Sequence, residues 1–126
     1  MRLLLLATMG GAIGAGARHL VNVGFGRLLG VHFPWSTLFV NIVGSFVMGI
    51  LVEAIVLRFG GSVELRTFLA TGILGGFTTF SAFSLDAYLL MTRGDTMQAA
   101  LYVAASVAIS ILGLFLGLTL TRQVLA

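Results

Sequence analysis

Four long apolar stretches make up most of the chain and restrict its fold more than any other feature. They lie at about residues 3–28, 34–57, 65–91 and 97–120. A helix needs about 20 apolar residues to cross the hydrocarbon of a bilayer, and each stretch is long enough. Only 9% of the 126 residues are charged, against about 25% in soluble proteins, which excludes a water-soluble globular domain. The sequence predicts one all-α membrane domain, residues 1–126, with four transmembrane helices.

The few charges exclude several partners and leave the orientation of the chain nearly undecided. There is no cysteine, so disulfides and thiolate metal sites are absent. All basic residues are isolated arginines, which is not the basic patch that nucleic-acid binding requires. Arginines are normally more frequent on the cytoplasmic side. Here Arg2, Arg58, Arg66 and Arg122 share one side, and Arg27 and Arg93 lie on the other, which also holds Arg18 if that side chain reaches the surface. This weak bias suits a chain that inserts both ways and forms an antiparallel homodimer.

Arg18 is the one cation well inside an apolar stretch, and it counts toward the second side only if it reaches that surface. Its long side chain can extend along the helix to the membrane interface. Alternatively, it attracts anions from a vestibule. We therefore consider Arg18 a vestibule or structural residue.

The third stretch contains an unusual sequence, because Gly75 and Gly76 are followed by a run of threonine and serine. Adjacent glycines and hydroxyl residues weaken a helix, and this stretch would place the weak point at mid-membrane. Non-helical backbone is tolerated at that depth only where protein or a cavity receives it. Freed carbonyls at such a break can coordinate a cation. The alternative is an intact helix whose hydroxyls bond its own carbonyls and whose glycines serve packing.

Phe80 and Phe83 lie three residues apart in the same segment, among hydroxyl side chains. Aromatic residues at helical spacing usually serve packing. The edge of an aromatic ring is electropositive, however, so phenylalanine edges can line a path for an anion without adding an ionisable group. Thr79, Ser81 and Ser84 can supply O–H donors beside the rings.

Asn41 in the second stretch and two serines in the fourth complete the polar candidates. The amide of Asn41 either links two helices by hydrogen bonds or donates to an ion in a pore. Ser106 and Ser110 are four residues apart and therefore share one helix face. They either continue a polar track or bond their own helix backbone.

No pattern in the chain indicates catalysis. Glu53 and Asp86 do not form a carboxylate pair, and His19 and His32 have no metal-ligating partner at a useful spacing. Phosphate-binding loops and nucleophile–base arrangements are also missing, so we do not expect an enzyme. Two other functions remain open. A small multidrug exporter would need a carboxylate within the membrane, whereas the first stretch contains no acid; a non-catalytic scaffold would use its polar residues only to join helices.

Three segments resemble the Fluc (CrcB) family of fluoride channels, and the resemblance extends over essentially the whole chain. They are Gly10–Ala15 leading to Arg18, Thr37–Asn41 followed by Gly44–Phe46, and Gly75–Ser84. The third segment is highly specific. Two positions depart from the family pattern: Ala82 replaces a common threonine, and Asp86 replaces a common glutamate.

The resemblance implies a dual-topology antiparallel homodimer in the bacterial inner membrane, with two fluoride pores that lower cytoplasmic fluoride passively. It also implies a third helix broken at mid-membrane and a central sodium ion held by the backbone carbonyls of Gly75 and Thr78. The pore residues that it implies are Phe80, Phe83, Asn41, Ser81, Ser84 and, on the fourth helix, Ser110. Arg18 occupies the position of the family's first-helix arginine.

Overall fold

The computed structural model describes residues 1–126 and contains helices but no strands. Four helical segments are long and apolar enough to cross a membrane: α1 (Arg2–Leu29), α2 (Trp35–Arg58), the segment Val63–Thr92, and α6 (Thr96–Leu125). This confirms the prediction of an all-helical chain with four segments able to span a bilayer. Only 17 of the 126 residues are buried, so most apolar side chains face outward, as they do when lipid is the solvent.

The third segment is the least regular of the four. It consists of α3 (Val63–Leu65), the π-helix η1 (Arg66–Leu74), α4 (Gly75–Phe77) and α5 (Ser81–Thr92). In η1 the hydrogen bonds reach one residue further than in an α-helix, and the Gly75 N–H donates to the Ala70 carbonyl at its end. Thr78, directly after α4, is extended, with φ −86° and ψ 160°. Residues 78–80 therefore form a non-helical segment between α4 and α5.

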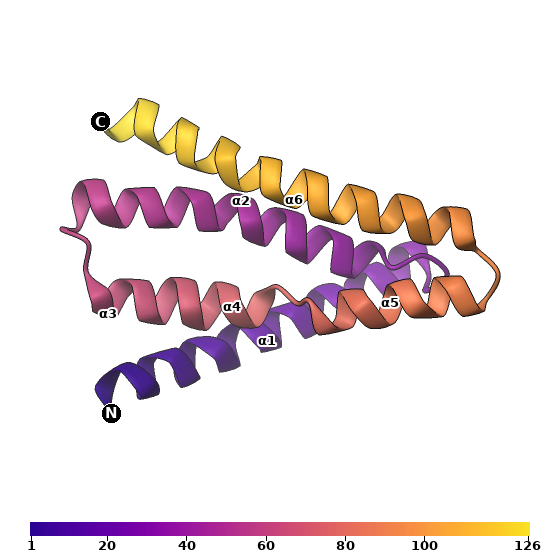
Figure 1. The fold of residues 1–126 in the computed structure, drawn as a ribbon. Coiled ribbons are helices and arrows are strands. Elements are labelled where there is room, and N and C mark those ends of the chain that lie inside the picture. The colour runs from indigo at the N-terminus through magenta and orange to yellow at the C-terminus, as the bar shows by residue number, and fades with distance from the viewer.

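The helices pack in two pairs, α2 with α6 and α1 with the third segment, and α5 joins the two pairs. α2 lies along α6, α1 lies against η1 and α4, and α5 contacts α6. Both termini and the connection from α2 to α3 lie at one end of the molecule (Figure 1). The other end carries residues 30–34, between α1 and α2, and residues 93–95, between α5 and α6.

Glycines allow the backbones of α1 and the third segment to approach closely. A Cβ atom at Gly10 would overlap the Phe68 carbonyl, and one at Gly14 would overlap the Ile73 carbonyl. On the other side of the contact, a Cβ at Gly76 would lie 2.5 Å from the Gly11 carbonyl oxygen. Small residues four apart are the usual means by which helices pack closely in lipid, where no hydrophobic effect draws them together. Gly75 and Gly76 are themselves helical, at the start of α4.

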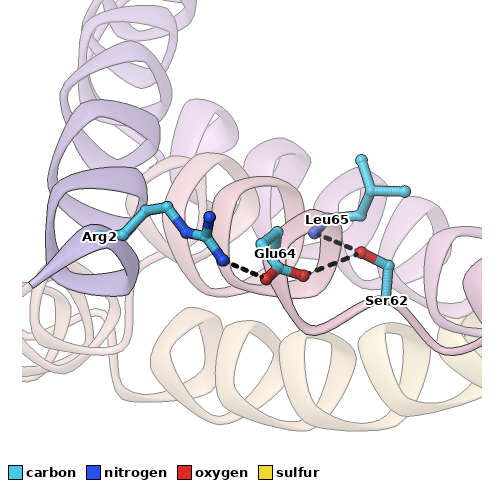
Figure 2. Close-up of polar contacts among 4 residues, drawn as sticks. All are labelled: Arg2, Ser62, Glu64 and Leu65. Carbon is cyan, nitrogen blue, oxygen red and sulfur yellow. Dashed lines mark hydrogen bonds and ion pairs between the residues drawn. The ribbon is translucent and has the colours of Figure 1, made fainter.

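Polar side chains join the helices at the end of the bundle that carries the termini (Figure 2). The Ser62 hydroxyl accepts the Leu65 N–H at 3.2 Å and so caps the start of α3. The Arg2 guanidinium binds the Glu64 carboxylate at 2.8 Å, which links the start of α1 to the third segment. Because Arg2 and Glu64 are both exposed, this ion pair contributes at most about 1 kcal/mol.

The glycine contacts predict a position-specific effect of adding one methyl group. Gly14→Ala should destabilise the fold by about 1–3 kcal/mol, since its Cβ overlaps backbone that cannot rotate away. Gly24→Ala on the same helix is the matched control, because nothing lies within 4 Å of its Cβ. Thermal unfolding in detergent should show a lower midpoint for Gly14→Ala alone. Equal midpoints for the two variants would contradict the packing of α1.

Candidate functional site

A groove of about 340 Å³ brings together side chains from three parts of the chain. Its lining consists of residues from α2, from segment 78–80 with the start of α5, and from the middle of α6: Asn41, Ser45, Thr78, Thr79, Phe80, Phe83, Ser106, Val107, Ser110 and Ile111. Five residues that the sequence singles out as pore candidates are among them, namely Asn41, Thr79, Phe80, Phe83 and Ser110. Two others, Ser81 and Ser84, do not line it.

The two phenylalanine rings form one wall of the groove and differ sharply in exposure. Their ring centroids are 5.5 Å apart, with an angle of 55° between the planes. Phe83 is 7% exposed, whereas Phe80 is 77% exposed. Phe83 also packs against Tyr102 of α6. The groove therefore borders the core at Phe83 and reaches the outer surface of the chain at Phe80.

Asn41 holds the non-helical segment by both ends of its amide. Its Nδ2 donates to the Thr79 carbonyl at 2.9 Å, and its Oδ1 accepts the Thr79 N–H at 2.7 Å. These hydrogen bonds satisfy backbone groups of a residue that lies outside both helices, which is necessary where no water is available. An amide nitrogen carries two N–H groups. One donor of Asn41 therefore remains beyond its bond to Thr79, and the side chain both joins helices and lines the groove.

Arg18 binds the backbone on the other side of the non-helical segment. Its Nε donates to the Gly76 carbonyl at 3.0 Å. The same side chain lines a second cavity of about 420 Å³, together with Thr37 of α2 and Asp86 of α5. Thr79 lines this cavity as well as the groove. The two hollows thus meet at the residue that Asn41 holds in place.

The carbonyls of Gly75 and Thr78 have lost their usual helical donors. In a continuous helix they would accept the N–H groups four residues later. Instead, the Thr79 N–H donates to Asn41, and the Ala82 N–H donates to the Thr79 hydroxyl at 3.1 Å. Backbone oxygens freed in this way suit a hard cation. No cluster of three His, Cys, Asp or Glu side chains offers another metal site, and two carbonyls from one chain are too few for a complete coordination shell.

The hydroxyls of Ser106 and Ser110 are buried and have no hydrogen-bond partner. Some other hydroxyls bond their own helix: Ser84 donates to the Phe80 carbonyl at 3.0 Å, and Thr119 donates to the Phe115 carbonyl at 2.8 Å. A buried polar group without a partner is costly. The sequence leaves two interpretations open, a polar track or bonding to their own helix. The structure shows no hydrogen bond from either serine to its own helix. Both residues line the groove, and neither hydroxyl has a hydrogen-bond partner within the chain.

Sequence reasoning missed several of the residues that line the two hollows. Ser45 lines the groove and lies four residues after Asn41, a spacing that places both on one helix face and could have identified it. Asn22 of the second cavity is related to Arg18 in the same way. Thr37 and His19 also line the second cavity. The place of these two side chains in the cavity depends on how α1 packs against α2, which no local sequence pattern predicts.

The two carboxylates within apolar stretches are engaged in contacts inside the chain. Glu53 forms an ion pair with Arg122, with 3.0 Å between Oε1 and Nε. Asp86 accepts a hydrogen bond from the Tyr102 hydroxyl at 3.0 Å. Glu53 lines neither the groove nor the second cavity. A proton-coupled exporter requires a free carboxylate at its transport site, and Glu53 does not fit that role.

Known proteins resemble this chain over nearly its full length. The family model described as CrcB-like protein, Camphor Resistance (CrcB), matches residues 5–118. A protein of Chelativorans sp. is 59% identical over 122 residues, covering 97% of this chain and 98% of its own length. Another, from Mesorhizobium japonicum, is 58% identical over 120 residues and covers 95% of this chain and 96% of its own length. A third, from Rhodospirillum centenum, is 50% identical over all 126 residues of this chain and 100% of its own length.

All three relatives are named fluoride-specific ion channel FluC. That name describes a channel, which confirms the prediction that a chain of this kind is not an enzyme. The family match and these identities together extend from the first helix to the last. The chain therefore belongs to the CrcB family.

Proposed function

We propose that this chain is a fluoride-selective ion channel of the bacterial inner membrane, which passively exports fluoride from the cytoplasm and relieves its toxicity. The names of its relatives support the choice of ion. Four helices able to span a bilayer support a multi-pass membrane protein. The family contains channels, so flux follows the fluoride gradient and the membrane potential rather than a chemical step.

The unpaired hydroxyls of Ser106 and Ser110 are the observation that carries the proposal. Fluoride is small and strongly hydrated, so a pathway must replace its water with closely spaced donors. The groove offers these two hydroxyls, one free N–H of Asn41 and the edges of two aromatic rings. None of these groups carries a full positive charge. Binding can therefore be strong enough to dehydrate the ion and weak enough to release it.

The second cavity and the groove suggest an order for the pathway. In the second cavity the Arg18 guanidinium offers anions a local positive contact, and Thr79 lines both this cavity and the groove. Fluoride then passes Thr79 and moves along Phe80 and Phe83 towards the serines of α6. Ser81, whose hydroxyl lies 3.4 Å from that of Thr79, assists at this boundary, and Ser84 lies beyond it on α5.

We further infer that the working unit is a dual-topology antiparallel homodimer with two pores. The high exposure of Phe80 supports this, because the groove lacks an outer wall in a single chain. The nearly even distribution of arginines between the two ends is compatible with insertion in both directions. In the dimer, the non-helical segment 78–80 lies at mid-membrane and is covered by the second copy.

A sodium ion at the centre of this dimer fits the carbonyls of Gly75 and Thr78. Their loss of helical donors supports a cation site, and a second copy would double the number of oxygen ligands. When bound, the ion supplies a positive field that does not titrate. On this chain, Asn41 and Arg18 hold the backbone on either side so that the two carbonyls stay oriented.

Purified protein in liposomes tests the function directly. Potassium fluoride-loaded vesicles treated with valinomycin should release fluoride rapidly to a fluoride electrode, while chloride-loaded vesicles should retain chloride. Protein-free vesicles are the control for leakage. Absence of fluoride release from folded dimer would refute the channel and favour drug and proton exchange at Asp86.

Replacing the pore rings should abolish flux without unfolding the protein. Phe80→Ile and Phe83→Ile each remove an electropositive ring edge, and fluoride release should fall sharply, by at least about tenfold. Phe115→Ile is the matched control, because Phe115 is an exposed ring on α6 that lines neither hollow. Gel filtration should show an unchanged dimer for all three. Unchanged flux in the two ring variants would support a scaffold whose polar residues only join helices.

The serines of α6 allow conduction to be separated from stability. Ser106→Ala and Ser110→Ala each remove a donor from the pathway, and fluoride flux should fall by about tenfold, the effect of losing one hydrogen bond to an ion. Thermal stability should stay equal or rise, since each substitution removes a buried unpaired hydroxyl. A variant that melts earlier but conducts normally would show that the hydroxyl has a structural partner instead.

A further inference from the structure

The cavity beside Arg18 contains a histidine that the proposed pathway does not use. His19 lines it from α1, next to Arg18 and Asn22. An ionisable side chain within a membrane-spanning helix is costly unless it faces water or a partner, and the cavity provides such a place. His19 is therefore positioned to influence any anion that approaches Thr79.

Apart from His19, the formal charges around this cavity sum to zero. Arg18 contributes one positive charge and Asp86 contributes one negative charge from α5. α2 contributes only Ser36, Thr37 and Val40, which carry no charge. With these two opposite charges balanced, the protonation state of His19 decides whether the cavity is neutral or positive.

Other titratable groups at this end of the bundle lie outside the cavity. His32 and Arg93 line a neighbouring cleft, which shares Asp86 with the cavity. Arg93 is already engaged, since its Nε lies 2.7 Å from the Asp95 carboxylate and its Nη2 donates to the His32 carbonyl at 2.7 Å. His19 is thus the histidine that adds charge within the cavity itself.

We propose that His19 is a second anion-attracting residue of the channel and that its protonation speeds the loading of fluoride. This inference rests on the proposed function. Histidine generally changes its charge between about pH 5 and 8 and is positive on the acidic side. Fluoride flux should therefore increase as the pH falls, because a positive cavity raises the local concentration of anions. Neutral hydrogen fluoride, which crosses bilayers unaided, also becomes more abundant as the pH falls, so only the release above that of protein-free vesicles at the same pH belongs to the protein.

The test measures fluoride release from liposomes between pH 8 and pH 6, with equal pH on both sides and leakage from protein-free vesicles subtracted. Wild-type flux should rise by at least about twofold at the acidic end. His19→Gln should stay at the slow rate throughout, and His19→Arg should stay at the fast rate. His32→Gln, the matched control, should keep the wild-type response. High ionic strength should reduce the pH effect, because salt screens exposed charges.

Each outcome separates this inference from the proposed function. Wild-type flux that does not change with pH, or a pH response that persists in His19→Gln, would overturn the role of His19 and leave the channel intact. A response lost in His32→Gln instead would assign it to the neighbouring cleft and also overturn the proposal. Absence of any fluoride release at any pH would refute the channel itself.

Discussion

The backbone groups of Thr79, which lies outside both helices, are paired by the side chain of Asn41, and the rest of the site depends on such contacts. Hydrocarbon offers no hydrogen bonds, so a residue that leaves a helix within the bilayer needs partners from the protein. Asn41 supplies both partners to Thr79, at 2.9 and 2.7 Å, and Arg18 binds the Gly76 carbonyl. These contacts reach the third segment from α2 and α1, and α6 completes the groove, so all four spanning segments must pack correctly before the site exists. The close glycine contacts of α1 make that packing possible.

The same contacts create the chemical character of the groove. Because Asn41 and the Thr79 hydroxyl take over the N–H groups of Thr79 and Ala82, two backbone carbonyls lose their helical donors. The chain also turns at this point, which brings Phe80 and Phe83 to the serines of α6. The groove therefore combines neutral donors and ring edges, while full charges stay in the separate Arg18 cavity. Under the proposed function, this division lets attraction and passage of an anion occur at different places.

Local patterns in the sequence account for the spanning segments but only for part of the site. Long apolar runs predict four spanning helices because bilayer thickness fixes their length. The motif of residues 75–84 and its resemblance to a family identify the two phenylalanines. The π-helix η1, by contrast, and the pairing of Asn41 with Thr79 depend on contacts between distant segments. The glycine pair at residues 75–76 is helical, and Gly76 lies against α1, whereas the extended residue is Thr78. The unpaired state of Ser106 and Ser110 likewise cannot be deduced from their spacing.

The reversal potential of the current in a planar bilayer tests the central claim, a passive and fluoride-selective channel, most directly. The measurement imposes a fluoride gradient, an opposing chloride gradient and a pH difference across the membrane. A passive fluoride channel predicts a current that reverses at the fluoride equilibrium potential, whatever the chloride and proton gradients are. A reversal potential that follows chloride would contradict selectivity, and one that shifts with the proton gradient would contradict passive flux.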